Sequence, residues 1–150
     1  MNLVSFIYSC FIFEFMVRAI FGHRDVDHED ARRTITTVLN GDLGDFVGKQ
    51  VKVLEMKQTG FLGGPNGHFH LDYDELWYVL EGRAIFEFDD LDNTDTYKFD
   101  MTKGNRVLIP SKVAHRVLAY ENCTLIGVTE RVYDSSVVND QPFNFGPWRD

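Results

Sequence analysis

The sequence predicts an all-β domain, either a sandwich or a small barrel of antiparallel strands. Three observations predict this fold class. Short runs rich in Val, Ile, Phe and Tyr recur along the chain, each run closes on Gly, Asn, Asp or Pro, and turns return roughly every eight to twelve residues. Because we find no internal repeat and no low-complexity tract, a single domain accounts best for the pattern.

Nine strands are expected in the body of the chain, and turn-forming residues such as Gly63–Gly67 and Asp89–Asp95 separate them. The expected strands are Thr34–Leu39, Gln50–Lys57, Gly67–Leu71, Leu76–Glu81, Arg83–Phe88, Thr96–Met101, Arg106–Pro110, His115–Ala119 and Thr124–Arg131. We therefore place the barrel at residues 34–133. An apolar segment (1–22) and a polar linker (23–33) precede it, and an aromatic-rich tail (134–150) follows and is expected to pack on it.

The amino-terminal run Leu3–Phe21 is almost wholly apolar, and its few polar residues recur every four or five positions, as on one stripe of a helix. Glu14 and Arg18 argue against a spanning helix, and Asn2 gives no positive start for a secretory signal. We favour a packed or oligomer-facing segment. A membrane anchor or uncleaved signal, a strand swapped between subunits, and a natural start at Met16 stay open.

The composition excludes several function classes. The 150 residues include 15 Lys and Arg against 23 Asp and Glu, a net charge of −8, so neither nucleic acid nor an anionic membrane surface is an expected partner. A hydrophobic share of 44% excludes wholesale disorder. Cys10 and Cys123 belong to no CxxC or Cys/His ladder, so we expect buried thiols and a reducing, cytoplasmic location.

Histidines gather in two of the expected strands. His68 and His70 are two residues apart, so both imidazoles project from the same face of a strand. Glu75 opens the next strand after the connection Leu71–Asp74, and a hairpin there would return it beside the two histidines. His115 begins another alternating run. Each residue alone is as easily structural, whereas the set has the composition of a metal site.

The spacing is H-x-H-x4-E-x6-G from His68 to Gly82, followed by G-x5-P-x4-H from Gly104 to His115. This pattern resembles the two motifs of the cupin superfamily over about 60 residues, from 63 to 122. The chain departs from the motifs at three positions that are not metal ligands. Gly63 lies one residue too close to His68, Ala119 replaces Asn, and Lys112 replaces Gly, so we expect the turn after Pro110 to be built differently.

The resemblance implies a small antiparallel β-barrel of the double-stranded β-helix, or jelly-roll, type. It also implies one divalent metal held by His68, His70, Glu75 and His115. Three imidazoles and a carboxylate suit Fe, Mn, Ni, Cu or Zn, and no thiolate in the set selects a softer ion. Four protein ligands on an octahedral ion leave two positions for water, O₂ or a bidentate substrate.

Three further residues are candidate catalytic or pocket residues, each with an ordinary structural alternative. Trp77 alternates with Glu75 onto the same face and would form a pocket wall. Tyr73 lies between two expected ligands and would act as an acid or base, or gate entry. Arg106 is the cation expected to clamp a carboxylate or phosphate, whereas Arg116 should point away from His115.

Two likenesses bear on activity. The stretches HLDYDELWYVLEG and MTKGNRVLIPSKVAHRV are similar to acireductone and thiol dioxygenase-type cupins, and residues 30–36 and 130–134 are similar to the ends of nucleotide-sugar ketoisomerase cupins. We expect a metal-dependent enzyme on a small oxygenated substrate, a dioxygenase ahead of a sugar or nucleotide-sugar isomerase or epimerase. A non-catalytic binding or sensor barrel is the alternative. Unpaired edge strands favour a homodimer.

Overall fold

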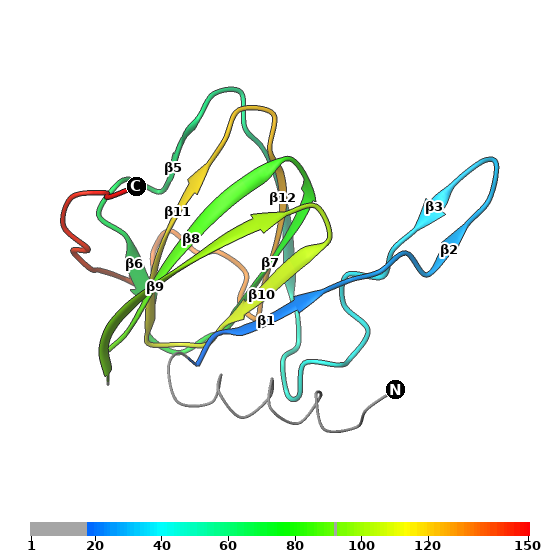
Figure 1. Cartoon of the computed structure of the whole chain (residues 1–150). Coiled ribbons are helices and arrows are strands. Elements are labelled where there is room, and N and C mark those ends of the chain that lie inside the picture. The colour runs from blue at the N-terminus through cyan, green and yellow to red at the C-terminus, as the bar shows by residue number, and fades with distance from the viewer. Residues whose placement is uncertain (1–17, 92) are drawn as a thin grey trace, which may run out of the picture.

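The computed structural model describes residues 18–91 and 93–150. The expectations for the apolar amino-terminal segment up to residue 17, including Cys10 and a start at Met16, lie outside these residues. Within the described part of the chain, no helix is long and apolar enough to cross a membrane. The described chain is all-β and antiparallel, which confirms the predicted fold class (Figure 1).

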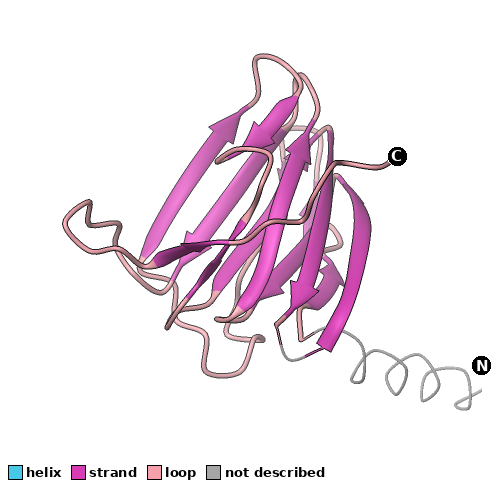
Figure 2. Cartoon of the chain, turned by 90° about the vertical axis from the view of Figure 1, so that its left-hand side faces the viewer, coloured by secondary structure: helices cyan, strands magenta, loops and turns pink. Residues whose placement is uncertain are grey.

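Two sheets make up the body of the molecule (Figure 2). The β7 sheet has the order β1-β10-β7-β12-β4, and its strands are Ile20–His23 (β1), Asn105–Ile109 (β10), Glu75–Glu81 (β7), Thr124–Thr129 (β12) and Gln50–Glu55 (β4). The β11 sheet has the order β13-β6-β11-β8-β9, with β5 also paired to β11. Its strands are Asp140–Pro142 (β13), His68–His70 (β6), Val113–Ala119 (β11), Arg83–Asp90 (β8), Asn93–Thr102 (β9) and Gly60–Leu62 (β5).

The main hydrophobic core contains inward-facing residues of both sheets. Trp77 and Val79 come from β7, and Phe86 and Phe88 come from β8. Because side chains of a strand alternate between its two faces, each strand gives one apolar row to the core and one row to the outside. The site described below lies on these same inward-facing rows.

A second, smaller core covers the outer face of the β7 sheet. Phe46 packs there with Leu76, Leu108 and Val128. The expected strand Thr34–Leu39 is reduced to β3 (Thr34–Ile35), because its last residues pack against this outer face instead of continuing a ladder. A strand in a ladder and a segment packed on the face of a sheet can both show alternating apolar residues, so the pattern does not distinguish them.

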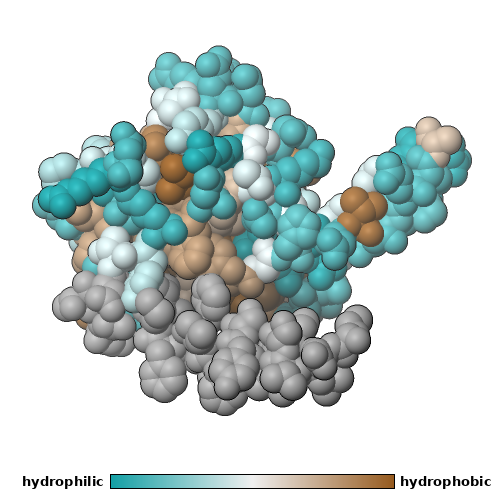
Figure 3. All heavy atoms as spheres, in the orientation of Figure 1, coloured by the Kyte–Doolittle hydropathy of each residue, from teal (hydrophilic) through white to brown (hydrophobic). Residues whose placement is uncertain are grey.

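The other eight expected strands are present with shifted ends, and four short strands were not expected. One of these, β2 (His28–Glu29), falls in the predicted polar linker and pairs with β3. The resulting hairpin projects from the body as an arm whose surface is largely hydrophilic (Figures 1 and 3). Strands β1, β5 and β13 have three or four residues each, too few for alternation to reveal them.

The carboxy-terminal tail lies against the β11 sheet. Its strand β13 pairs with β6, in the register Asp140↔His70 and Pro142↔His68. Farther along the tail, the rings of Phe145 and Trp148 lie 5.1 Å and 5.0 Å from the Arg116 guanidinium. The tail therefore runs beside the strand that carries two of the predicted ligands.

Candidate metal centre

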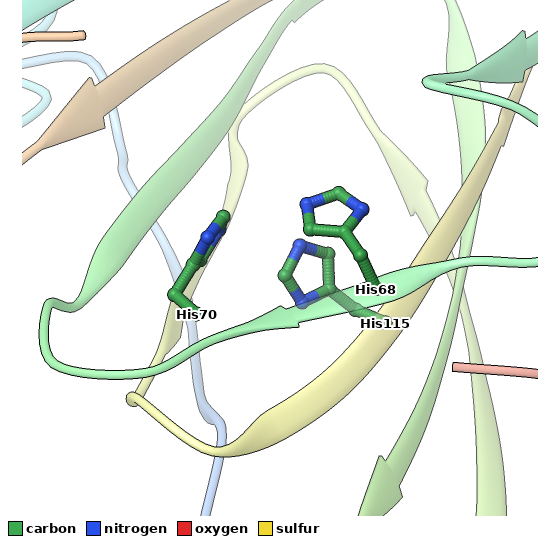
Figure 4. Close-up of side chains that lie close together, drawn as sticks. All are labelled: His68, His70 and His115. Atoms are coloured by element: carbon green, nitrogen blue, oxygen red, sulfur yellow. The ribbon is translucent and has the colours of Figure 1, made fainter. Parts of the chain in front are cut away.

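The three predicted histidines meet on the inner face of the β11 sheet (Figure 4). His68 and His70 come from β6, and His115 comes from β11, where it is directly paired with His68. One ring nitrogen from each lies within 4.8 Å of the others, and the ring centroids are 4.5 to 5.1 Å apart. Alternation and strand pairing thus bring all three imidazoles together.

Glu75 completes the cluster from the opposite sheet. Its Oε2 lies 3.2 Å from Nε2 of His70 and 3.5 Å from Nε2 of His115. The expected hairpin between His70 and Glu75 is wrong, because β6 belongs to the β11 sheet and β7 to the other sheet. The connection Leu71–Asp74 crosses between the sheets, so Glu75 approaches the imidazoles from across the core.

Hydrogen bonds fix the orientation of two of the rings. Nδ1 of His115 lies 3.1 Å from the carbonyl oxygen of Val113, and Nδ1 of His70 lies 2.9 Å from Oδ1 of Asp140. A carbonyl oxygen only accepts hydrogen bonds, so Nδ1 of His115 carries the proton. In both residues the other nitrogen, Nε2, faces the Glu75 carboxylate.

Asp140 was missed by the sequence analysis. It lies 70 residues from His70 and belongs to no recognisable motif, and the only signal was that the tail should pack on the barrel. Its Oδ1 also accepts a hydrogen bond from the hydroxyl of Tyr73, at 3.2 Å. The Tyr73 ring stacks on His70, with centroids 4.3 Å apart and planes inclined by 25°. Tyr73 therefore lies in the site, as expected, but its hydroxyl is bonded to a carboxylate.

Burial and neighbouring charges shift the pKa values of the cluster residues in different directions. Burial, together with the neighbouring His115 and His70, lowers the pKa of His68 to about 4, so its imidazole is neutral at pH 7. Burial also opposes the charge on His70, but hydrogen bonds and negative charge from Glu75 and Asp140 outweigh it and raise the His70 pKa. Burial would raise the pKa of Glu75, yet His115 and His70 lower it far below its usual value.

The residues present fit a divalent metal. Three imidazoles and an ionised carboxylate converge, and two Nδ1 atoms are held by oxygen acceptors, the arrangement in which metal-binding histidines are typically oriented. This donor set suits Fe, Mn, Ni, Cu or Zn, as the sequence pattern predicts. Cys123 lies in the hydrophobic core, where burial raises its thiol pKa, and takes no part.

The cluster opens into a cavity of about 650 Å³ between the sheets. Its walls include the apolar side chains of Leu54, Leu62, Trp77 and Val117. The Trp77 ring packs closely against Gly127 of β12, where a Cβ would lie 2.9 Å from it. The indole Nε1 is buried and finds no hydrogen-bond partner among the residues the structure describes. Trp77 is thus a wall residue, as expected from alternation.

Arg106 does not reach the cavity, so its expected role as a clamp is wrong. Alternation along β10 sends Val107 and Ile109 into the main core and turns Arg106 to the outer face. There its guanidinium donates to the Val38 carbonyl oxygen at 2.8 Å and to both carboxylate oxygens of Asp42. Arg106 therefore holds the segment that contains Val38 and Asp42 against the outer face of the β7 sheet.

Two other arginines near the motifs are also paired with acids. Arg83 forms two bonds of 2.7 Å with Asp100 on the surface. Arg116 pairs with Glu87 behind β11 and, as expected, points away from His115. Lys52 and Arg131 line the cavity and were missed, and Arg116 is also among its lining residues.

The turn after Pro110 keeps a backbone conformation that glycine favours, contrary to the expectation from Lys112. Lys112 has a φ of 63°, in the left-handed region, and its N–H donates to the His70 carbonyl oxygen at 2.7 Å. Gly67, just before His68, has a φ of 84°, and a Cβ there would lie 2.8 Å from the His115 carbonyl oxygen. Both turns hold the histidine strands in place.

The chain is similar to known proteins in sequence and in fold. No family model matches the chain. The uncharacterised protein YdbB of Bacillus subtilis is 30% identical over 83 residues, which cover 55% of this chain and 68% of YdbB. That similarity includes about two thirds of YdbB and shows that the two proteins share a family.

Solved structures show the same fold at low sequence identity. A 3,4-ketoisomerase, QdtA from Thermoanaerobacterium thermosaccharolyticum in complex with TDP-4-keto-6-deoxyglucose, superimposes with a TM-score of 0.67. It is 13% identical, over 84% of this chain and 88% of that one. The dTDP-4-dehydrorhamnose 3,5-epimerase of Bacillus anthracis has a TM-score of 0.68 and 15% identity, over 83% and 78% of the two chains. The chain therefore shares the fold of these two enzymes and belongs to the family of YdbB.

Proposed function

We propose that this chain is a metal-dependent isomerase or epimerase acting on a carbonyl-bearing sugar that is linked to a nucleotide. The observation that carries the proposal is the convergence of the His68, His70 and His115 imidazoles with the Glu75 carboxylate inside a cavity. The fold similarity to a ketoisomerase and an epimerase of TDP-sugars supports this reaction class over the dioxygenase that the sequence favours.

Glu75 is the residue proposed to move the proton. Two adjacent imidazoles keep its carboxylate ionised. One carboxylate oxygen would bind the metal, and the other would take a proton from a carbon next to a carbonyl and return it to a neighbouring position. The same interactions lower the pKa of Glu75 and so make it a weak base. Proton transfer is most efficient when the pKa of the base lies near the working pH. The substrate carbon must therefore be made more acidic. A divalent metal in the cluster supplies Lewis acidity to the substrate carbonyl.

The walls of the cavity exclude water and orient the sugar. Leu54, Leu62 and Val117 surround the cluster with apolar surface, while Gln50 and Thr129 offer polar groups to hydroxyls. A volume of about 650 Å³ is in the usual range for a small-molecule site, roughly 300 to 1,000 Å³. A reactive sugar intermediate would be shielded from side reactions there.

The outer part of the cavity suits the phosphate-bearing half of such a substrate. Lys52 and Arg131 line it, and the Lys52 ammonium lies 5.4 Å from the ring centroid of Tyr133. Tyr133 is 69% exposed, so a flat group can lie against its ring. An ammonium and an open aromatic ring together complement a phosphate joined to a base.

A dioxygenase is the second candidate, and a specific observation favours it. The complete set of three imidazoles and one carboxylate leaves two positions on an octahedral ion, enough for O₂ and a substrate side by side. A non-catalytic binding barrel is the outcome if no metal is bound.

For assembly we propose a homodimer through the β4 edge of the β7 sheet. β4 pairs only with β12 among the described strands, and Val51 and Val53 on it are 65% and 63% exposed. An exposed edge with β-branched side chains is a template for pairing with a second copy.

Deuterium exchange tests the proposed reaction. Metal-free protein is reloaded separately with Fe(II), Mn(II), Ni(II) or Zn(II) and incubated in D₂O with TDP-4-keto-6-deoxyglucose. Mass spectrometry and NMR then follow deuterium on the sugar ring and the appearance of an isomer. His115→Ala protein treated in the same way is the matched control.

We expect metal-dependent exchange with the wild-type protein and none with His115→Ala. Absence of exchange with every metal would contradict the proposal. Oxygen uptake by the Fe(II) form with a 1,2-dicarbonyl, an enediol or a thiol would replace it with the dioxygenase.

A further inference from the structure

We propose that Asp140 and Tyr73 form a clamp that holds His70 in the orientation needed for metal binding, so that the carboxy-terminal tail completes the metal centre. The clamp is defined as these two side chains. The inference rests on the proposed metal site, and its test separates failure of the clamp from failure of that site.

The contacts of His70 point to this role. Oδ1 of Asp140 lies 2.9 Å from Nδ1 of His70 and 3.2 Å from the Tyr73 hydroxyl, so a single oxygen joins the two aromatic residues. The Tyr73 ring covers one face of the imidazole at a centroid distance of 4.3 Å. The imidazole is thereby fixed both along its edge and across its face.

The clamp also determines which nitrogen is available. A carboxylate accepts but does not donate, so Asp140 keeps a proton on Nδ1 of His70. In neutral His70 the lone pair is then on Nε2, which faces Glu75 at 3.2 Å. Without Asp140, the proton is free to occupy Nε2, and the ring is free to turn about its χ2 axis. Either change removes a ligand.

Tyr73 is suited to hold Asp140 rather than to exchange protons with a substrate. Its phenolic hydroxyl can donate one hydrogen bond. That donor is occupied by the Asp140 oxygen. Tyr73 is therefore a positioning residue.

The tail delivers Asp140 through ordinary strand pairing. Asp140 is opposite His70 in the β13–β6 ladder, which sets its position along the strand. Beyond β13, the Phe145 N–H donates to the Asn66 carbonyl oxygen, and the Gly146 carbonyl oxygen accepts from the Arg116 guanidinium at 2.8 Å. The tail is thus anchored along β6, at the loop that precedes His68 and on Arg116.

Metal affinity tests the clamp. Zn(II) is titrated into metal-free wild-type protein and into Asp140→Ala, Asp140→Asn and Gln141→Ala in competition with a chromophoric chelator. Gln141 is the matched control, because it neighbours Asp140 on β13 and does not line the cavity. Long-range ¹H–¹⁵N NMR of the Zn(II) forms identifies which nitrogen of His70 carries the proton, and circular dichroism checks the fold.

We expect Asp140→Ala to weaken Zn(II) binding roughly 10- to 100-fold, the usual effect of removing a group that orients a metal ligand. Asp140→Asn should lose less, because its amide oxygen still accepts from Nδ1, and Gln141→Ala should bind like wild type. Wild-type affinity and an unchanged Nδ1–H signal in Asp140→Ala would overturn the clamp. Failure of the wild-type protein to bind Zn(II) would instead overturn the metal site.

Discussion

His115 and Arg116 are neighbours on β11, both about 2% exposed, yet they belong to two different kinds of polar cluster. Behind the strand, the Arg116 guanidinium pairs with Glu87 and donates to the carbonyl oxygens of Pro65 and Gly146, each at 2.8 Å. Inside the barrel, His115 faces the cavity with two other imidazoles and the Glu75 carboxylate.

The two clusters differ in whether their charges and hydrogen-bonding groups find partners within the cluster. The Arg116 cluster brings a carboxylate and two carbonyl oxygens to one cation, so its charge is balanced and three hydrogen bonds hold it. In the histidine cluster, Asp140 binds the outer nitrogen of His70, and the three imidazoles direct nitrogen atoms toward a common region beside the Glu75 carboxylate. A buried charge with matched partners maintains the fold, whereas converging donors mark a place for a ligand.

The largest expected effect is on the histidine cluster. His70→Ala or His115→Ala should abolish metal binding, because each removes one of four donors, while the β-sheet circular dichroism stays largely intact. Metal analysis after reloading measures the loss. Normal metal content in both variants would contradict the assignment of the cluster.

The opposite pattern is expected for the Arg116 cluster. Arg116→Met leaves Glu87 buried and unpaired, which typically lowers the free energy of unfolding by about 3–5 kcal/mol. Urea unfolding measures this change, and metal stoichiometry of the folded protein should stay at one. The double variant Arg116→Met/Glu87→Leu is the control and should recover part of the loss. A single variant as stable as wild type would show that the ion pair is not structural.

A smaller effect is expected at the edge of the histidine cluster. Tyr73→Phe removes the hydroxyl bonded to Asp140 but keeps the ring stacked on His70. Turnover with the substrate identified by the exchange assay should fall less than tenfold. Steady-state kinetics measures this change, and a larger fall in kcat would assign Tyr73 a direct part in the reaction.

The smallest effect concerns the surface pair on the outer face of the β7 sheet. A hydrogen bond from Arg106 lowers the pKa of Asp42 below 3.8, so this carboxylate contributes stability above that pH and loses it as the pH falls through its folded-state pKa. Asp42→Asn should therefore be less stable than wild type at pH 6, with the difference shrinking under acid. Urea unfolding from about pH 6 to about pH 2.5 tests this, and a constant difference would contradict it.

The sequence predicted most of the site because its information is local. The spacing of His68 and His70 determines a shared face, and motif spacing marks Glu75 and His115 without any knowledge of the sheets. The path of the chain between His70 and Glu75 was harder to predict, since a hairpin and a crossover between the sheets both bring Glu75 to the same place. Asp140 could not be identified, because its pairing with β6 depends on how the tail packs.

Arg106 was misplaced for a related reason. Its position near the second motif suggested a ligand clamp, but the face on which a strand residue lies depends on register, and β10 turns Arg106 toward Asp42. A shift of one residue in register would reverse that direction. The short strands β1, β5 and β13 were missed because three or four residues carry too little alternation.

X-ray absorption spectroscopy of the reloaded wild-type protein tests the central claim most directly, because it reports the atoms bound to the metal. The account predicts one metal per chain, coordinated by about three imidazoles and by oxygen, and no sulfur. A spectrum with sulfur ligands, or with fewer than two imidazoles, would contradict the assignment of His68, His70, Glu75 and His115 as the metal centre.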